Sequence, residues 1–563
     1  MKILLNHVGF EPQAPKQALL QAPAGAGPAA LALLDGEGRI AADIPLRPQG
    51  MAEGWPEWHY WLADFSGWTQ PGRYRLWLRD SAPPVISHEF EVGPDCLGSQ
   101  MLSDLLHYFK SQRCTGLYDQ ADRTVPEWGG EARRDARGGW FDASGDCSKY
   151  LSHLSYANFM NPQQTPLLAW CLMAGRDALP PQPRWFDERM VDEALHGADF
   201  LLRMQHSSGF FYMTLFDGWS KAPEQRELCA FTTQRGVRSG AFQAGFRQGG
   251  GLAIAALARA AELPRDGEFG RGDYLAAARR GFAHLQQYNA RYLDDGCENL
   301  IDDYCALLAA CELYAASGEP VFADAADRRA RRMLAQQDEA GRFWMDAQRR
   351  HSYFHAVEAG LPYLALLRFA AVLPTSPLAS DARRAVRRGM EAEMTLTAAA
   401  GNPFAYPRQW VARNGEEGVA RFFMPQQNGS GYWWQGENAR LASLAAACGL
   451  AQQESLEESL EEGEPLRAYA QGALDWILGR NPFDVCMLQG WGRNNPRYEP
   501  GYYNACGGVC NGITAAPGAD EGIAFLSPKE TDIGQSWRWT EQWLPHGAWL
   551  FLALALRRRA NEG

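Results

Sequence analysis

The chain has 563 residues, which at roughly 150 residues per domain corresponds to two to four domains, or to one large domain with a small companion. Hydrophobic residues make up 46% and charged residues 21%, a composition that excludes an intrinsically disordered protein. The 54 Lys and Arg residues against 66 Asp and Glu residues leave a net charge of -12, which argues against nucleic acid or an anionic membrane as the main partner.

No segment has the length of a membrane-spanning helix. The longest apolar run, Ala548–Leu556, is far shorter than the roughly 20 residues that such a helix needs. The first residues, MKILLNHVGF, have too short an apolar segment and no cleavage site for a secretory signal. We therefore expect a cytoplasmic protein without a membrane partner.

Residues 1–95 are predicted to form a small all-β sandwich. Short segments of alternating hydrophobicity are separated by turn sequences such as Asp35-Gly36 and Gln70-Pro71-Gly72, which is typical of antiparallel strands. The expected strands are Lys2–Leu5, Ala30–Leu34, Tyr74–Arg79 and His88–Val92.

Residues 96–563 are predicted to form a second, helical domain. Apolar residues recur at helical spacing, for example from Val191 to Leu202 and from Ile301 to Cys311, the latter ahead of Gly318. Long loops in a compact domain are usually functional, so we expect the site on the loops rich in Gly, Pro and aromatic residues. These loops are Gly209–Gly251, Gly401–Trp434 and Asn481–Trp537.

Two aspartates in the segment GGWFDASGDCSKY are candidates for catalysis. Asp142 and Asp146 stand four residues apart across a Ser-Gly turn, flanked by aromatic residues and a lysine. If both carboxylates converge on one water, one takes its proton while the other orients it, as a general base for hydrolysis requires. The alternative is that one of them only caps a turn or a helix.

One glutamate near the C-terminus, Glu541, is set among several tryptophans. Packing against indoles removes water from a carboxyl and raises its pKa toward the range of a general acid. A proton donor and a water-activating Asp together are what glycoside hydrolysis needs. The alternative is that Glu541 caps the last helix, which Pro545 opens, and that the indoles are core. The tryptophans are Trp537, Trp539, Trp543 and Trp549.

Four motifs in order resemble glycoside hydrolase family 9 over nearly the whole chain. ILLNHVGFEP at Ile3–Pro12, with Asp64–Leu78, resembles the immunoglobulin-like N-terminal domain of many members. GGWFDASGD resembles the signature GGWYDAGD, and DWILGRNP at Asp475–Pro482 resembles the second signature. TEQWLPHGAWLFLALA resembles the closing motif that supplies the acid.

The resemblance implies an all-α (α/α)6 barrel behind the β-sandwich and hydrolysis of β-1,4-linked glycans with inversion. By this resemblance Asp146 is the general base, Asp142 its companion at the water, and Glu541 the general acid. An inverting pair of carboxyls is expected to lie roughly 6.5–9.5 Å apart. The partner is then an oligosaccharide, with no cofactor. No metal is expected either, because the Cys-His element of some members' zinc site is missing after Cys114.

Several departures from the cellulase pattern point to a branch of the family that resembles exo-β-D-glucosaminidases. The aspartates have one extra residue between them, Cys147-Ser148 replaces the usual His-Gly, and Asn494–Pro500 replaces a Pro-His-His-Arg stretch. A glucosaminide needs a carboxylate for its 2-ammonium group, and Asp142, Glu437 and Glu499 are candidates.

Other residues are candidates for contacts with sugar, since an aromatic ring matches the apolar face of a pyranose. They are Trp140, Lys149, Tyr432, Trp433 and Trp434, with core packing as the alternative for the tryptophans. Two further functions remain open: a β-1,4-glucanase or cellodextrinase of the same family, and a non-catalytic glycan-binding protein.

Overall fold

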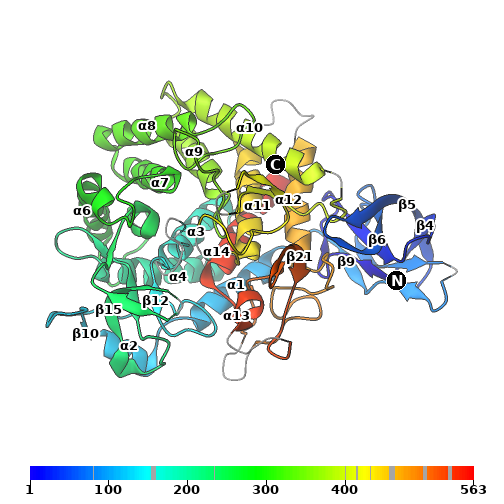
Figure 1. Cartoon of the computed structure of the whole chain (residues 1–563), viewed down its shortest axis with the longest axis horizontal. Coiled ribbons are helices and arrows are strands. Elements are labelled where there is room, and N and C mark those ends of the chain that lie inside the picture. The colour runs from blue at the N-terminus through cyan, green and yellow to red at the C-terminus, as the bar shows by residue number, and fades with distance from the viewer. Residues whose placement is uncertain are drawn as a thin grey trace.

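The computed structural model describes residues 1–79, 81–153, 160, 162–233, 235–399, 401–413, 416–430, 433–454, 463–498, 504–530 and 535–562. An N-terminal β part lies beside a larger helical part (Figure 1). The last strand of the β part ends at Val92 and the first helix begins at Ser99, on either side of the boundary predicted at residue 95. None of the helices described is long and apolar enough to cross a membrane.

The N-terminal part is all-β, as predicted, and each of the four expected strands is present. Its strands pair in the order β1-β3-β6-β5-β4-β7-β9-β2, with β8 beside β7. The long strand β5 pairs with β4 through its first residues and with β6 through its last, so both halves of the sheet close over one hydrophobic core. The strands are β1 (Lys2–Leu4), β2 (Gly9–Phe10), β3 (Gln17–Ala22), β4 (Ala30–Leu34), β5 (Ile40–Ala52), β6 (Trp55–Asp64), β7 (Gly72–Leu78), β8 (Val85–Ile86) and β9 (Phe90–Val92).

Six helices of the second part form a closed inner ring. Each packs against the next in chain order, and the last helix, α14, packs against both α11 and α3, which closes the ring. These inner helices are α3 (Thr165–Ala178), α5 (Gly250–Ala260), α7 (Leu300–Ser317), α9 (Leu361–Val372), α11 (Glu437–Gln453) and α14 (Leu544–Glu562).

An outer helix packs on each inner one. The outer helices and their inner partners are α4 (Arg184–Arg203) on α3, α6 (Arg271–Tyr288) on α5, α8 (Pro320–Ala335) on α7, α10 (Ala379–Ala398) on α9, α12 (Gly463–Ile477) on α11 and α1 (Ser99–Ser111) on α14. Shorter helices are α2 (Gly116–Asp122), α13 (Trp537–Thr540) and the 3-10 turns η1 (Pro223–Gln225), η2 (Phe246–Gln248) and η3 (Asn289–Arg291).

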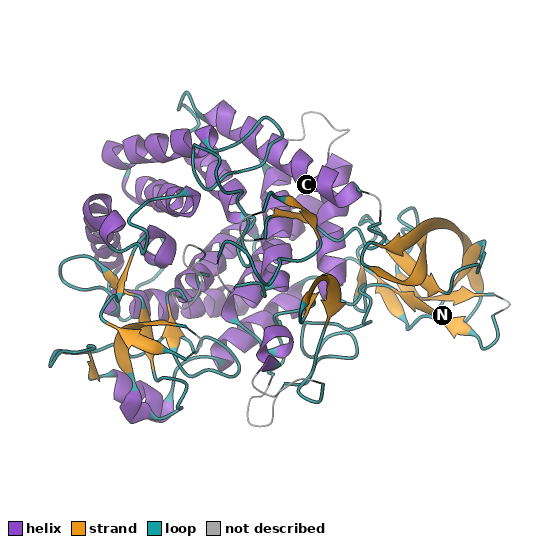
Figure 2. Ribbon diagram, viewed as in Figure 1, coloured by secondary structure: helices purple, strands orange, loops and turns teal. Residues whose placement is uncertain are grey.

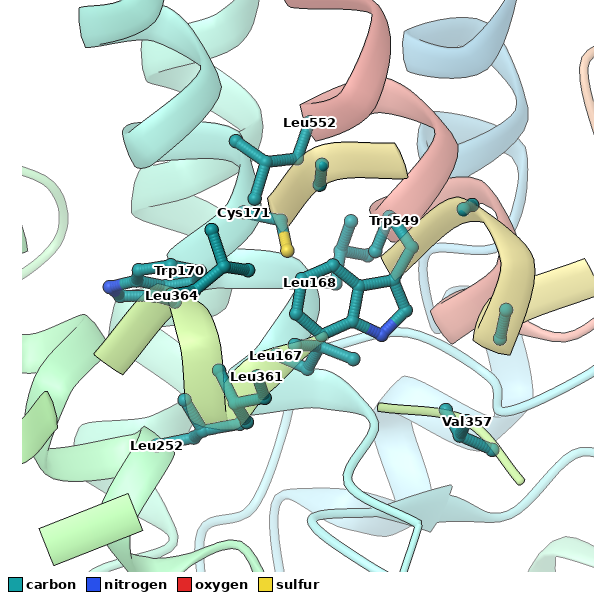
Figure 3. Close-up of a cluster of buried hydrophobic side chains, with 14 of the residues drawn as sticks. Leu167, Leu168, Trp170, Cys171, Leu252, Val357, Leu361, Leu364, Trp549 and Leu552 are labelled. Atoms are coloured by element: carbon teal, nitrogen blue, oxygen red, sulfur yellow. The ribbon is translucent and has the colours of Figure 1, made fainter. Parts of the chain in front are cut away.

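The residue pattern explains which helices lie inside. An inner helix has neighbours on every side, so its sequence is apolar nearly all round, as in GGLAIAALARA of α5. Side chains from α3, α5, α9 and α14 meet in the core shown in Figure 3, among them Leu168, Leu252, Leu364 and Trp549.

Local signals set both ends of α7, and its last residue falls just before Gly318, as the sequence predicted. The side chain of Asn299 accepts a hydrogen bond from Ile301 N (2.8 Å), and Asp302 Oδ2 accepts one from Asn299 N (3.1 Å). At the other end, Gly318 adopts a φ of 68°, a conformation that few other residues tolerate.

The long loops between the helices contain short antiparallel strands that the sequence did not predict (Figure 2). Segments of two to six residues are too short to show an alternating pattern. They pair as β10 (Val125–Pro126) with β11 (Arg133–Arg134), β13 (Phe211–Tyr212) with β17 (Gln243–Ala244), β18 (Gln409–Val411) with β19 (Val419–Arg421), and β20 (Thr514–Ala516) with β21 (Ala519–Ala524). A four-stranded sheet is formed by β12 (Lys149–Tyr150), β14 (Thr214–Phe216), β15 (Glu227–Thr232) and β16 (Val237–Ser239).

Two of the sequence motifs bind each other at the joint between the parts. Asn6 Nδ2 donates to Asp475 Oδ1 at 2.9 Å, and His7 N donates to the carbonyl of Leu478 at 2.9 Å. The motif ILLNHVGFEP of the β part thus docks on DWILGRNP of the helical part.

A second contact is made by the turn between β5 and β6. The indole of Trp55 packs on Phe422 (ring centroids 4.6 Å apart) and Phe423 (5.8 Å), and Glu53 N donates to the carbonyl of Gly401 at 2.8 Å. These partners belong to the loop that leads toward Trp433, so the β part supports a functional loop of the helical part.

Replacing Trp55 with Ala is expected to lower the free energy of unfolding by about 3 kcal/mol, because truncating a buried aromatic side chain creates a cavity. Trp55 is 8% exposed, whereas Trp185 on α4 is 59% exposed. Urea denaturation of Trp55→Ala and of the control Trp185→Ala measures the difference. The control should change the free energy by less than about 0.5 kcal/mol. Equal effects of the two substitutions would contradict this account of the joint.

Candidate active site

The loop that carries the two aspartates begins with two glycines, Gly138 and Gly139, whose backbone conformation other residues rarely adopt. Gly138 and Gly139 have φ values of 78° and 69°, and a Cβ on Gly139 would lie 2.7 Å from the ring of Phe200. The two glycines of this GGW segment therefore meet a backbone requirement, and they turn the chain toward Asp142.

The aspartate loop is paired directly with the segment that carries Glu541. Ala143 and Trp543 form an antiparallel bridge. Ser144 N donates to the carbonyl of Gln542 at 2.9 Å, and Leu544 N donates to the carbonyl of Asp142 at 3.2 Å. Backbone pairing across some four hundred residues of chain thus brings the three predicted catalytic carboxyls together.

Two hydrogen-bond donors stabilise the ionised form of Asp146. Its Oδ1 accepts a hydrogen bond from Ser148 N at 2.8 Å, and its Oδ2 accepts one from Tyr150 Oη at 2.7 Å. Burial raises the pKa of Asp146 and the nearby Asp217 raises it further, while the two donors lower it. Asp146 remains partly exposed, so a water can reach it.

Asp142 lies deeper and contacts a histidine. It is 2% exposed, and its Oδ2 lies 3.1 Å from Nε2 of His153. Its Oδ1 has no hydrogen-bond partner within the described part of the chain. Burial raises the pKa of Asp142 well above its usual range, and the charge of Asp146 raises it further.

Glu541 has the surroundings of a proton donor. It is 7% exposed, and its Oε2 accepts a hydrogen bond from Trp543 Nε1 at 2.6 Å. Burial raises the pKa of Glu541 to about 8, although the Trp543 N–H acts in the opposite direction. Near pH 7 this carboxyl therefore carries a proton. The alternative that it only caps the last helix does not fit, since α14 begins at Leu544.

Two residues predicted to bind substrate lie behind the loop instead. Trp140 is fully buried and its Nε1 donates to Glu193 Oε1 at 2.6 Å. Lys149 is also fully buried; its Nζ lies 2.7 Å from Asp122 Oδ2 and donates to the carbonyls of Ala136 and Gly138. The prediction that Trp140 and Lys149 contact sugar is therefore wrong. The polar atoms of both side chains are bound within the protein, where they hold the loop in place.

Glu437, a predicted ammonium ligand, is neutralised by its own helix. It is 2% exposed, and its Oε2 accepts hydrogen bonds from Arg440 Nε (2.9 Å) and from Tyr406 Oη. A carboxylate already paired with a buried guanidinium has no charge to offer a sugar, so this prediction is wrong.

The two tryptophans predicted as sugar platforms are buried. Trp433 is 1% exposed and contacts the rings of His153 (5.5 Å between centroids) and Trp543 (5.4 Å), so it forms the wall behind the site. Trp434 is 4% exposed and packs on Trp539. Neither offers an open ring face, and the core-packing alternative is the correct one. Tyr432 and Glu499 lie outside the described residues.

Three residues that sequence reasoning missed hold the carboxyls in place: Tyr150, His153 and Asp217. Asp217 accepts a hydrogen bond from Ser148 Oγ at 3.0 Å and so fixes the floor of the loop. The sequence offered only weak signs of two of them: Tyr150 lies four positions after Asp146, and His153 is one of 11 histidines in the chain. No cluster of metal-binding side chains occurs among the residues described.

A buried, protonated Glu541 and a partly exposed Asp146 that accepts two hydrogen bonds together form the kind of carboxyl pair that a glycoside hydrolase uses. The family model for glycosyl hydrolase family 9 matches residues 99–499, and that for the cellulase N-terminal ig-like domain matches residues 1–82. The chain belongs to glycosyl hydrolase family 9. The matched range contains Asp142 and Asp146 and ends before Glu541.

Two curated proteins similar to this chain are named as enzymes that act on glucans. Endoglucanase C of Cellulomonas fimi is 25% identical over 545 residues, which cover 87% of this chain and 44% of that protein. Cellodextrinase of Butyrivibrio fibrisolvens is 29% identical over 180 residues, which cover 28% of this chain and 30% of that protein. The chain thus spans less than half the length of the curated relatives it matches.

Solved structures share the fold over the full chain. A family 9 protein of Bacteroides ovatus is 18% identical with a TM-score of 0.67, over 100% of this chain and 99% of that one. A metagenome-derived glycoside hydrolase family 9 endoglucanase is 20% identical with a TM-score of 0.67, over 99% of each chain.

Replacing Trp543 with Phe is expected to raise the pKa of Glu541 by about one unit, because the lost N–H hydrogen bond stabilises the ionised carboxylate. A ¹³C NMR titration of the Glu541 carboxyl measures the shift. Trp539→Phe is the matched control, since Trp539 is equally buried but its Nε1 has no partner in the described chain. An unchanged or lower pKa in Trp543→Phe would show that the contact does not act on Glu541.

Proposed function

We propose that this protein hydrolyses β-1,4 glycosidic bonds in a single displacement with inversion. The observation that carries the proposal is the backbone pairing that brings a protonated Glu541 to the same site as Asp146, whose ionised form two hydrogen-bond donors stabilise. Membership of glycosyl hydrolase family 9 and the names of its relatives support it. The closed ring of paired helices supports the further inference that the helical part is an (α/α)6 barrel.

The proposed steps follow from the protonation states. Glu541 donates its proton to the glycosidic oxygen as the bond between that oxygen and the anomeric carbon breaks. A water attacks the anomeric carbon from the opposite face, and Asp146 takes the proton that the water loses. Asp142 orients this water. Proton exchange with solvent then returns Glu541 and Asp146 to their starting states.

We propose β-1,4-glucan oligomers as the substrate class that the comparisons favour, since the relatives are named endoglucanase and cellodextrinase. A cavity of about 990 Å³ lies at the start of α7 and has Trp344 and Trp410 in its lining, whereas Asp142, Asp146 and Glu541 do not line it. The cavity therefore does not by itself choose between substrates.

A second candidate is exo-β-D-glucosaminidase activity, which Asp142 favours. This carboxyl lies beside the proposed base, and its Oδ1 has no partner in the described part of the chain. A 2-ammonium group on the sugar would supply that partner through a charge-assisted hydrogen bond and stabilise the ionised form of Asp142.

Glu541→Gln and Asp146→Asn are each expected to lower kcat about 100-fold or more, because each amide cannot transfer the proton that its carboxyl does. Release of reducing ends from soluble oligosaccharides gives the rates. Glu188→Gln, at an exposed position on α4, is the control and should retain the wild-type rate. Full activity in either of the two site variants would overturn the assignment.

Parallel incubation with cellobiose, longer β-1,4-glucan oligomers, glucosamine dimer and N,N'-diacetylchitobiose separates the two substrate classes. Preferred release of glucose supports the glucan proposal, and preferred release of glucosamine supports the second candidate. Proton NMR of the first product should show the α-anomer, as inversion requires. The β-anomer in early spectra would contradict a single displacement.

A further inference from the structure

The imidazole of His153 contacts Asp142 and the two aromatic side chains that bind Asp146 and Glu541. Its Nε2 lies 3.1 Å from Asp142 Oδ2. Its ring lies 4.3 Å from the ring of Tyr150 and stacks at 5.1 Å and 23° on the indole of Trp543, centroid to centroid. His153 is 8% exposed, so the protein encloses it.

Each of these three aromatic side chains binds a different carboxyl. Tyr150 Oη donates to Asp146 at 2.7 Å, and Trp543 Nε1 donates to Glu541 at 2.6 Å. His153 contacts Asp142 and both neighbouring rings. The three rings come from strand β12, the loop after it and the segment before α14, so they join parts of the chain that are far apart in sequence.

We propose that His153 is a positioning residue of the active site, which holds Asp142 through Nε2 and fixes it relative to Asp146 and Glu541 through its contacts with Tyr150 and Trp543. The proposal rests on the proposed function for the reaction that it serves. Burial lowers the pKa of His153 to about 4, so near pH 7 the imidazole is neutral and offers Asp142 a directed contact without a competing positive charge.

This contact fixes the direction in which the other carboxyl oxygen of Asp142, Oδ1, points. With Oδ2 held by His153, Oδ1 is the atom of Asp142 that remains for a water or for an ammonium group on the substrate. A side chain that merely filled the same space would leave the carboxyl able to rotate, and the water or the sugar would be held less accurately.

Two substitutions separate the contact from the packing. His153→Phe keeps a ring against Tyr150 and Trp543 but removes Nε2, whereas His153→Gln keeps an N–H donor without the ring. We expect His153→Phe to lower kcat about 10- to 100-fold on the preferred oligosaccharide, because Asp142 loses the contact that fixes its direction, with KM nearly unchanged. His153→Gln should recover a severalfold part of that loss.

The matched control is His206→Phe, because His206 also stacks on an aromatic ring, that of Phe210 at 4.6 Å and 13°, and contacts none of the three carboxyls. It should retain the wild-type kcat. A wild-type kcat in His153→Phe, or a loss in which KM alone changes, would overturn the proposal.

A measurement without substrate tests the contact if a His153 variant fails to fold. Among the 11 histidines, His153 and His206 are followed by ¹⁵N NMR of the imidazole in wild type and in Asp142→Asn. We expect the Nε2 resonance of His153 to move and that of His206 to stay. Identical His153 spectra would reject the contact, whereas a moved resonance in a protein inactive on every sugar would keep the contact and reject the proposed function.

Discussion

The antiparallel contact between residues 142–144 and 542–544 is the constraint on which the site depends. It unites the loop before α3 with the segment before α14, the first and last helices of the inner ring. The same two helices pack together, so the packing that closes the ring and the contact that assembles the proposed catalytic carboxyls join the same two parts of the chain. A contact over so many residues forms only when the intervening helices are in place, because its loop-closure entropy must be offset by their packing.

Aromatic residues around the site affect the carboxyls in two ways. They exclude water, which raises the pKa values of Asp142 and Glu541, and they supply the few donors that set the carboxyls apart. Asp146 accepts hydrogen bonds from two donors, which stabilise its charged form, while Glu541 accepts one from an indole N–H and retains its proton near pH 7. Different partners thus separate the proposed base from the proposed acid, although their side chains are chemically similar.

The joint between the two parts shows that a motif can mark an interface as well as a site. Asp475 of DWILGRNP is fully buried and binds Asn6 of the β part instead of facing the carboxyl cluster. Trp55 packs against the loop that leads to Trp433, behind His153. The β part therefore contributes to the shape of the site without providing any of its carboxyls.

The sequence by itself determined the division into a β part and a helical part, the end of α7 at Gly318, and Asp142, Asp146 and Glu541 as the candidate carboxyls. These features depend on local periodicity, caps and short motifs, which neighbouring residues set. Only the tertiary structure decided that Trp140, Lys149 and Glu437 serve the interior and that His153 reaches Asp142 and Trp543. Burial of a side chain and its contacts with distant segments depend on how the whole chain packs. The spacing of residues along the sequence therefore does not predict them.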